Sequence, residues 1–321
     1  MKKQKIIILG SSGFIGKNIA IKLTKNNDYQ VYGTYLRNKP NIKKIKLIRV
    51  DLTKEQNVNK VLKNKDIVIN AAAVTSGSKE VSSNPMKFVS DNVIMNSLVC
   101  KYSTINNVKK IILLSCSIVY ATSGSKKVFV KESDLNLKNE IYEKYFGFAW
   151  IKIYLEKMAQ FYSSFKITEF IVLRHSNLYG PFDKFDSLKS HVLASLILKT
   201  VNSKKKHIEI FGKGNESRDL LYIDDFVEAV RMLITKKLGY FKVFNVGSGS
   251  LYSVNKLAKI IKNYSNSKKK IINNLNYSNI NTNIALNCGK IKKEIKWSYK
   301  TKINEGIEKT IRWYTNYYLK K

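Results

Sequence analysis

Three glycines near the start of the chain have the spacing of a turn that binds phosphate groups. Gly10, Gly13 and Gly16 come directly after an apolar run and open a helix-like segment. Glycine permits the tight turn and the close approach of a pyrophosphate, and the start of the helix offers free N–H groups and a favourable dipole. The spacing is one residue longer than the general dinucleotide fingerprint. The predicted cofactor contacts are Gly10, Ser12, Gly13, Phe14, Ile15 and Gly16.

The residues after the second predicted strand indicate which dinucleotide would bind. An NAD site usually places a carboxylate there, against the ribose hydroxyls. Residues 34–39 of this chain carry no carboxylate, and Arg37, helped by Lys39, could instead meet the 2′-phosphate of NADP. The sequence therefore favours NADP over NAD. The alternative is that both cations are ordinary solvated loop residues.

Two further segments are placed to line the same cofactor. Asp51 and Leu52 follow the third predicted strand, where we expect them to contact the adenine. Ala71, Ala72 and Ala73 follow the fourth strand. Small side chains there would let the backbone lie close to the cofactor.

A parallel sheet is needed to position these residues, and the first half of the chain has its pattern. Apolar runs alternate with helix-like segments, which is typical of βαβ units with helices on both faces of the sheet. The expected strands are residues 5–9, 30–34, 46–50, 66–71, 109–115 and 169–174. The expected helices are residues 13–25, 53–63, 85–103 and 145–164.

The second half of the chain has a more mixed pattern. Strands are expected near residues 208–211 and 243–246, and helices near 224–233, 254–263 and 303–318. We therefore predict an α/β fold, in which a Rossmann doubly wound parallel sheet carries a smaller, mixed α/β C-terminal substrate-binding lobe. The NAD(P)-binding domain would comprise residues 1–175 and about 220–250, and the lobe residues 176–219 and 251–321.

The net charge of +35 over 321 residues would ordinarily point to nucleic acid. The lysines are scattered along the chain without an aromatic-interleaved basic stripe, so we expect no nucleic-acid partner. A basic surface would still attract an anionic diphosphate substrate. The three cysteines, Cys100, Cys116 and Cys288, are too widely spaced to indicate a disulfide framework or a metal site.

Neither a membrane span nor an export signal is expected. The basic residues at the start of the chain lead into only four apolar residues before Gly10, which is too short for the apolar core of a signal peptide. A cytoplasmic location without a membrane partner follows as the expectation.

Further motifs extend nearly end to end along the chain. They lie at residues 70–73 (Asn-Ala-Ala-Ala), Asn92, residues 115–120 (Ser-Cys-Ser-Ile-Val-Tyr), 174–181 (Arg-His-Ser-Asn-Leu-Tyr-Gly-Pro), 212–225, 245–249 and 305–314. With the glycine turn, they make the sequence resemble the extended short-chain dehydrogenase/reductase family, the NAD(P)-dependent nucleotide-sugar epimerases and dehydratases. The resemblance implies a nucleotide-diphosphate sugar as substrate, and a homodimer paired through helices is common in that family.

Within the family, residues 180–185 and the Ser-His-Val element at 190–192 look most like GDP-fucose synthases, which are epimerase/reductases of a GDP-4-keto-6-deoxy sugar. Those enzymes carry a catalytic acid histidine in this element, so the resemblance assigns that role to His191. The alternative is a histidine at a helix start that only packs or forms hydrogen bonds.

The family's chemistry also uses a tyrosine and a lysine four residues apart on one helix face. The lysine and the positive cofactor ring lower the pKa of the phenol, which then exchanges a proton with a sugar hydroxyl. The pattern aligns with Phe148 and Lys152, so the lysine is present and the phenol hydroxyl is missing. Tyr145 lies seven residues before Lys152, too far along a helix to replace it, and Tyr162 falls two turns too late.

A second departure concerns the serine or threonine that bonds the reacting sugar oxygen in the family. Cys116 occupies that position, and a thiol is a weaker donor than a hydroxyl. Ser117 or Ser115 could compensate if the register shifts by one. An inert small core residue is the alternative for Cys116. Ile118 stands where the GDP-fucose synthases carry a cysteine base, which puts an epimerase step in doubt.

On the substrate side, the resemblance places two residues against the sugar diphosphate. Arg218 matches the arginine that grips the phosphates or the nucleotide ribose, and a guanidinium fork suits phosphate oxygens. Asn177 lies where the family contacts the sugar diphosphate, although a turn-capping role is an alternative.

Two functional hypotheses follow. The first is an NAD(P)-dependent epimerase, reductase or dehydratase of a nucleotide-diphosphate sugar, GDP-linked, for surface-glycan synthesis, in which His191 and a water replace the missing phenol. The second is a catalytically impaired member of the family that binds cofactor and nucleotide sugar without normal turnover. Phe148 would then be either natural or an engineered replacement of tyrosine.

Overall fold

A computed structural model describes residues 3–75, 86–121, 128–187, 189–276 and 283–318. Its centre is a parallel sheet of seven strands in the order β11-β7-β5-β4-β1-β2-β3. The strands are β1 (Gln4–Leu9), β2 (Tyr29–Tyr35), β3 (Lys46–Arg49), β4 (Ile67–Asn70), β5 (Lys110–Cys116), β7 (Glu169–His175) and β11 (Phe241–Val246). The predicted Rossmann doubly wound fold is confirmed.

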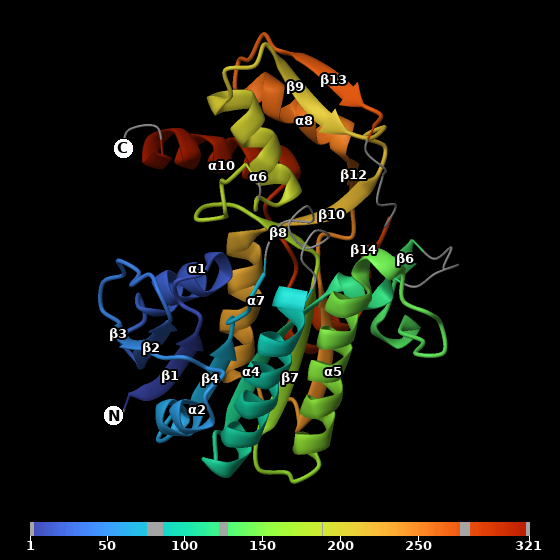
Figure 1. The fold of residues 1–321 in the computed structure, drawn as a ribbon. Coiled ribbons are helices and arrows are strands. Elements are labelled where there is room, and N and C mark those ends of the chain that lie inside the picture. Colours follow the sequence, from blue (N-terminus) through green and yellow to red (C-terminus); the bar gives the residue numbers. More distant parts are fainter. Residues whose placement is uncertain (1–2, 76–85, 122–127, 188, 277–282, 319–321) are drawn as a thin grey trace.

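Helices cover both faces of the sheet (Figure 1). One face packs against α1 (Phe14–Leu23) and α7 (Ile223–Thr235), and the other against α2 (Glu55–Leu62), α4 (Met86–Ile105) and α5 (Phe146–Ser163). Ile6 and Ile8 contribute to the first core and Ile7 and Leu9 to the second, because alternate residues of a strand point to opposite faces. With both faces buried, the strands are almost continuously apolar.

Most of the remaining elements gather beyond the carboxyl ends of the strands (Figure 1), whereas α9 (Gly289–Ile295) packs beside β11. They include a sheet of β8 (Asn177–Tyr179), β10 (Ser217–Tyr222) and β12 (Leu251–Ser253), and the pairs β9 (His207–Phe211) with β13 (Lys270–Asn274) and β6 (Phe129–Val130) with β14 (Ala285–Leu286). The helices are α6 (Val192–Ile197), α8 (Val254–Tyr264), α9 (Gly289–Ile295) and α10 (Ile303–Tyr318). Short helical turns are η1 (Ser117–Tyr120), η2 (Glu132–Asp134), η3 (Glu143–Tyr145) and η4 (Leu198–Asn202).

The long predicted elements are found within a few residues of their expected bounds, whereas several short ones were not expected. These are β6, β8, β10, β12, β13, β14, α6 and α9. They span two to seven residues, which is too short for hydrophobic periodicity to reveal them. In the described part of the chain, no helix is long and apolar enough to cross a membrane.

Candidate active site

The glycine turn is locked against the ends of β2 and β4. Gly10 has φ of +76°, and a Cβ there would lie 2.7 Å from the Cα of Ala72. Thr34 at the end of β2 fixes the turn, since its Oγ1 accepts the Gly10 N–H at 2.9 Å and its carbonyl accepts the N–H of Ser11 at 2.8 Å. Only glycine combines this backbone conformation with so close an approach.

The start of α1 is open to an anionic ligand. Its N-cap is Gly13, which has no side chain to bond the first-turn N–H groups, and the first turn carries no acidic residue. Helix N–H groups without a capping side chain form hydrogen bonds with water or with a ligand, and phosphate is well suited to accept them. Ser12 is exposed beside this helix start, and Phe14 and Ile15 belong to its first turn.

The segment after β4 is held beside the turn by two buried asparagines. Asn92 of α4 accepts the N–H of Val74 at 3.0 Å and donates to its carbonyl at 2.8 Å. Asn70 accepts the N–H of Ala72 at 3.3 Å. The backbone carrying Ala71 and Ala72 therefore lies at a fixed place next to Gly10, and Ala73 is exposed.

The residues predicted to contact the adenosine half of the cofactor differ in exposure. Arg37 and Lys39 are exposed just beyond β2. Asp51 uses its Oδ1 to accept the N–H and hydroxyl of Thr53 at 2.9 and 2.7 Å, and these hydrogen bonds lower the pKa of Asp51. The Leu52 side chain is buried in the core, so only its backbone is left for a ligand.

Lys152 and Phe148 share one face of α5. Lys152 donates from Nζ to the carbonyl of Leu114 at 2.7 Å, and burial lowers the pKa of its ammonium. The Phe148 ring packs against Phe88 of α4, with ring centroids 5.7 Å apart. Tyr145 is the N-cap of α5 and packs in the apolar cluster around Tyr120.

The three candidate residues at the end of β5, Ser115, Cys116 and Ser117, have different surroundings. Ser115 is fully buried and donates its hydroxyl to Glu156 of α5 at 2.6 Å, so it is committed to the core. Cys116 lies at the strand end, and burial raises the pKa of its thiol against the opposing charge of Lys152. Ser117 begins η1. A raised pKa leaves the thiol protonated, so Cys116 lacks the thiolate that a nucleophile needs.

A buried polar network beneath Lys152 was not anticipated from the sequence. Glu156, one turn after Lys152, receives Arg174 of β7 in a pair whose shortest N–O distance is 2.6 Å. Arg174 also donates to the hydroxyl of Tyr120 at 2.7 Å, and that hydroxyl donates to Asn245 at 2.8 Å. The network joins α5, β7, η1 and β11 around the carboxyl ends of the strands. Its only signal in the sequence was an acidic residue, Glu156, in a predicted helix and an arginine, Arg174, at the end of a predicted strand.

His175 is a second group that sequence reasoning missed. It ends β7 directly opposite Cys116 in the β5–β7 register, and its ring packs edge-on against Phe226 of α7, with centroids 5.5 Å apart. Its Nδ1 lies 2.7 Å from the carbonyl of Ser176. Because a carbonyl oxygen only accepts, Nδ1 carries the proton of the neutral ring and Nε2 carries the lone pair.

Two positively charged groups lie near His175 at the carboxyl end of the sheet. Burial lowers the pKa of His175 to about 4, and the positive charges of Lys152 and His191 lower it as well. Lys152 comes from α5 and His191 from the start of α6. The structure thus brings the predicted lysine and the predicted acid histidine to the same end of the sheet.

His191 forms a pair with a buried carboxylate. It is the N-cap of α6, its side chain is 44% exposed, and its Nδ1 lies 2.9 Å from Oδ1 of Asp183. Burial lowers the pKa of His191, but the hydrogen bond and negative charge of Asp183 outweigh it, and the net shift is upward. A histidine in this state exchanges protons near neutral pH.

Asn177 and Arg218 lie on the neighbouring strands β8 and β10. The Asn177 amide donates to the carbonyl of Asp219 at 3.2 Å, and one Arg218 nitrogen donates to the carbonyl of Ser217 at 3.0 Å. Asp219 is fully buried and accepts backbone N–H groups from Ser248, Gly249 and Leu286. This carboxylate therefore ties together the loops that flank Arg218.

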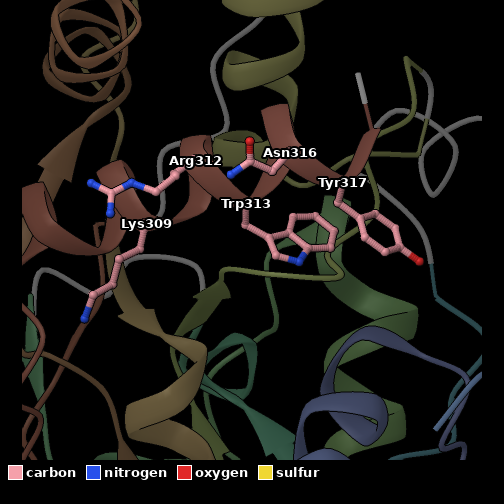
Figure 2. A pocket seen from close by; sticks show the side chains of 5 residues that line it. All are labelled: Lys309, Arg312, Trp313, Asn316 and Tyr317. Carbon is pink, nitrogen blue, oxygen red and sulfur yellow. The ribbon is translucent and has the colours of Figure 1, made fainter. Parts of the chain in front are cut away.

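A separate, shallow pocket of about 370 Å³ lies on α10. Figure 2 shows its lining side chains, all of which project from this one helix. They are Lys309, Arg312, Trp313, Asn316 and Tyr317. Trp313 and Tyr317 also contact Phe182, whose neighbour Asp183 holds His191. Among the described residues, no group of three or more His, Cys, Asp or Glu side chains could hold a metal ion.

The sheet order and the glycine turn at the end of β1 define a Rossmann-type dinucleotide-binding protein. A model of the NAD dependent epimerase/dehydratase family matches residues 6–247. The chain belongs to this NAD-dependent epimerase/dehydratase family.

Individual relatives are similar over most of the chain. GDP-L-colitose synthase of Yersinia pseudotuberculosis is 27% identical over 324 residues, which cover 97% of this chain and 98% of that protein. GDP-L-fucose synthase of Sinorhizobium fredii is 34% identical over 221 residues, or 66% of this chain and 68% of that one. The structure of UDP-glucose 4-epimerase of Thermotoga maritima with UDP-glucose has a TM-score of 0.86 at 24% identity, and covers 98% of this chain and 99% of that one.

The residues present fit the dinucleotide that the family implies. The positive φ of Gly10, its contact with Ala72 and the open start of α1 leave a cradle in which backbone can approach a pyrophosphate. Lys152 would hold the nicotinamide end from α5, where its ammonium already lies against the end of β5.

Proposed function

We propose that the chain is an NAD(P)-dependent epimerase or reductase that acts on a GDP-linked sugar, with His191 as the group that exchanges a proton with the sugar. The observation that carries this proposal is that Lys152, bonded to Leu114 of β5, and His191, paired with Asp183, both lie near His175 at the carboxyl end of the sheet. Ligands of open α/β sheets bind at that end.

Each residue has a part in this proposal. The nicotinamide cofactor, when bound, supplies or accepts the hydride at the sugar carbon. His191 gives or takes the matching proton at the sugar oxygen, so that a carbonyl and an alcohol interconvert. Lys152 holds the cofactor, and its positive charge favours a developing oxyanion. Arg218 would bind the diphosphate, with Asn177 beside it.

The GDP linkage is supported by the names of two relatives, GDP-L-colitose synthase and GDP-L-fucose synthase. The Ser-His-Val element at residues 190–192, which resembles that of GDP-fucose synthases, is consistent with it. For the cofactor we propose NADP, because Arg37 and Lys39 are exposed beyond β2 and no carboxylate stands there. A role in surface-glycan synthesis and a cytoplasmic location stay predictions from the sequence.

The second hypothesis, binding without turnover, is favoured by two side chains, Phe148 and Cys116. Phe148 fills the position of the proton-transfer group with a ring that packs on Phe88, and the neighbouring Cys116 thiol has a raised pKa. Neither side chain can then exchange a proton readily.

One experiment separates the two hypotheses. The protein is incubated with NADPH and with GDP-, UDP- and dTDP-linked 4-keto sugars, and cofactor oxidation and sugar products are followed in parallel with calorimetric binding. Oxidation with a GDP-linked sugar supports the enzyme. Binding of cofactor and sugar without turnover, in the natural chain and in Phe148→Tyr alike, would favour the binding protein.

We also propose that two copies pair through α5. An aromatic stripe with helical spacing is exposed on α5, at Phe146, Trp150, Tyr154 and Phe161. Exposed apolar stripes of this kind mark interaction sites. Sedimentation should show a dimer that Trp150→Glu weakens and that Tyr240→Glu, an exposed aromatic outside α5, leaves intact. A monomeric natural chain would rule out the pairing.

A further inference from the structure

The loop between β8 and α6 holds a strained residue just before the acid that contacts His191. Phe182 has φ of +68°, a region that costs a residue with a Cβ about 1 kcal/mol or more. Three contacts hold it there: Nζ of Lys17 lies 4.1 Å above its ring, and the ring centroids of Trp313 and Tyr317 lie 4.9 and 5.8 Å away. Figure 2 shows Trp313 and Tyr317 on α10, beside this loop.

A second anchor fixes the start of the same loop. Asn18 of α1 donates to the carbonyl of Pro181 at 2.9 Å. Phe185, further along, packs on Tyr314 of α10 with centroids 4.5 Å apart. The loop is therefore clamped on both sides of Asp183. Backbone strain that is over-determined in this way is found where a side chain must be placed exactly for function.

Asp183 itself is almost completely buried, with 2% of its surface exposed. Its Oδ1 accepts from Nδ1 of His191 at 2.9 Å and from the N–H of Lys184 at 2.8 Å. Its Oδ2 is buried and finds no hydrogen-bond donor among the residues that the structure describes. Burying a carboxylate is costly unless a cation balances it. The imidazolium form of His191 supplies such a charge at contact distance.

We propose that Asp183 is the positioning residue of His191, holding the ring by Nδ1 so that the opposite nitrogen, Nε2, meets the sugar oxygen. This inference rests on the proposed function, which supplies the sugar. The carboxylate fixes the tautomer, because only a protonated Nδ1 can donate to it, and Nε2 is then the one nitrogen that gains and loses the proton. Nδ1 keeps its proton both when Nε2 gains a proton and when Nε2 loses one.

The charges that face His191 come from two elements. Asp183 and Lys184 belong to the clamped loop, and the negative charge of Asp183 opposes the positive charge of Lys184. His175 faces it from the end of β7. Removing the Asp183 charge would leave His191 with burial and the positive charge of Lys184, both of which disfavour the imidazolium.

The test uses the whole protein and nitrogen-15 NMR of its histidines. The chain has only three, at 175, 191 and 207, so single substitutions assign them. At high pH, His191 of the natural chain should show a protonated Nδ1 and a bare Nε2. In Asp183→Asn, which keeps the shape of the side chain, the pKa of His191 should fall. Asp186→Asn, an exposed acid of the same loop, should leave it unchanged.

Two results would overturn the proposal. One is the opposite tautomer in the natural chain, a measurement that needs no variant to fold. The other is an unchanged His191 pKa in Asp183→Asn, or in Asp183→Ser, which introduces no buried amide. Thermal unfolding confirms that the variants compared are folded.

The kcat and KM of Asp183 variants provide a second test of the proposal. Asp183→Asn should lower kcat by about tenfold to a hundredfold with KM changed less than about twofold, because the variant misplaces a proton donor and leaves binding alone. Asp183→Glu, which restores the charge, should recover part of the loss. If the natural chain turns over no sugar, the proposed function fails, while the NMR titration still decides whether Asp183 controls His191.

Discussion

Phe148 and Lys152 lie one helical turn apart on α5, yet only Lys152 places a polar atom against the sheet, where Nζ donates to Leu114 at 2.7 Å. The helix keeps the geometry of a tyrosine–lysine pair and lacks its oxygen. Phe148→Tyr should therefore raise kcat by at least tenfold, since a general acid–base group contributes about 10² to 10⁴ in rate. Phe165→Tyr, exposed just beyond the same helix, is the control and should leave kcat unchanged. Equal rates for the natural chain and Phe148→Tyr would show that the phenol is dispensable here.

Two glycines of the cofactor turn should respond very differently to an added methyl group. At Gly10 the new Cβ would lie 2.7 Å from the Cα of Ala72 in a left-handed conformation, whereas at Gly13 its nearest neighbour lies at 3.4 Å. We expect Gly10→Ala to lower the free energy of unfolding by about 2–4 kcal/mol and Gly13→Ala by less than about 1 kcal/mol. Urea unfolding of the two variants measures this. Equal losses would contradict the close approach at Gly10.

In the proposed function, Arg37 makes the protein prefer NADP to NAD. A guanidinium bonded to the 2′-phosphate contributes about 1.5–3 kcal/mol, so Arg37→Ala should weaken NADP binding by about tenfold to a hundredfold and leave NAD binding unchanged. Calorimetric titration with both dinucleotides is the measurement, and Arg49→Ala, an exposed arginine of β3, is the control. Equal weakening of NADP and NAD would remove Arg37 from the 2′-phosphate site.

The ordinary pKa of a histidine is 6.5, and in the folded protein that of His175 is about 4. Between these values the unfolded chain binds more protons, so the free energy of unfolding rises with pH. The contribution of neutral His175 to the free energy of unfolding is fully present above pH 6.5. It is lost as the pH falls toward 4, and the total loss is about 3 kcal/mol. His175→Phe, which keeps a ring against Phe226, should flatten this part of the urea-unfolding profile. An unchanged slope would mean that His175 is not buried in its neutral form.

The fold could be predicted from the sequence because its determinants are local and repeated. Ile6 to Leu9 are buried on both faces of β1, which reads as a continuous apolar run, and Gly10, Gly13 and Gly16 follow where the turn needs them. Short elements such as β8 and β14 have too few residues to show a period, and their pairing depends on partners far away in the chain.

The site could be predicted only in part, for a related reason. Phe148 and Lys152 are four residues apart, so their relation is visible in the sequence. Asp183 and His191 are eight residues apart in a loop, and their contact depends on the strained turn at Phe182. His175 meets Cys116 only through the strand register. Such contacts are created by tertiary structure, and residue types alone do not reveal them.

The role of His191 as proton donor is tested most directly by single-turnover reduction of a GDP-linked 4-keto sugar. The NADPH-loaded natural chain and His191→Asn are compared at saturating sugar. We predict that His191→Asn lowers the rate by about 100-fold or more while both ligands still bind, because the donor of the proton is lost and the cradle is not. A His191→Asn rate equal to that of the natural chain would contradict the account and place proton transfer elsewhere.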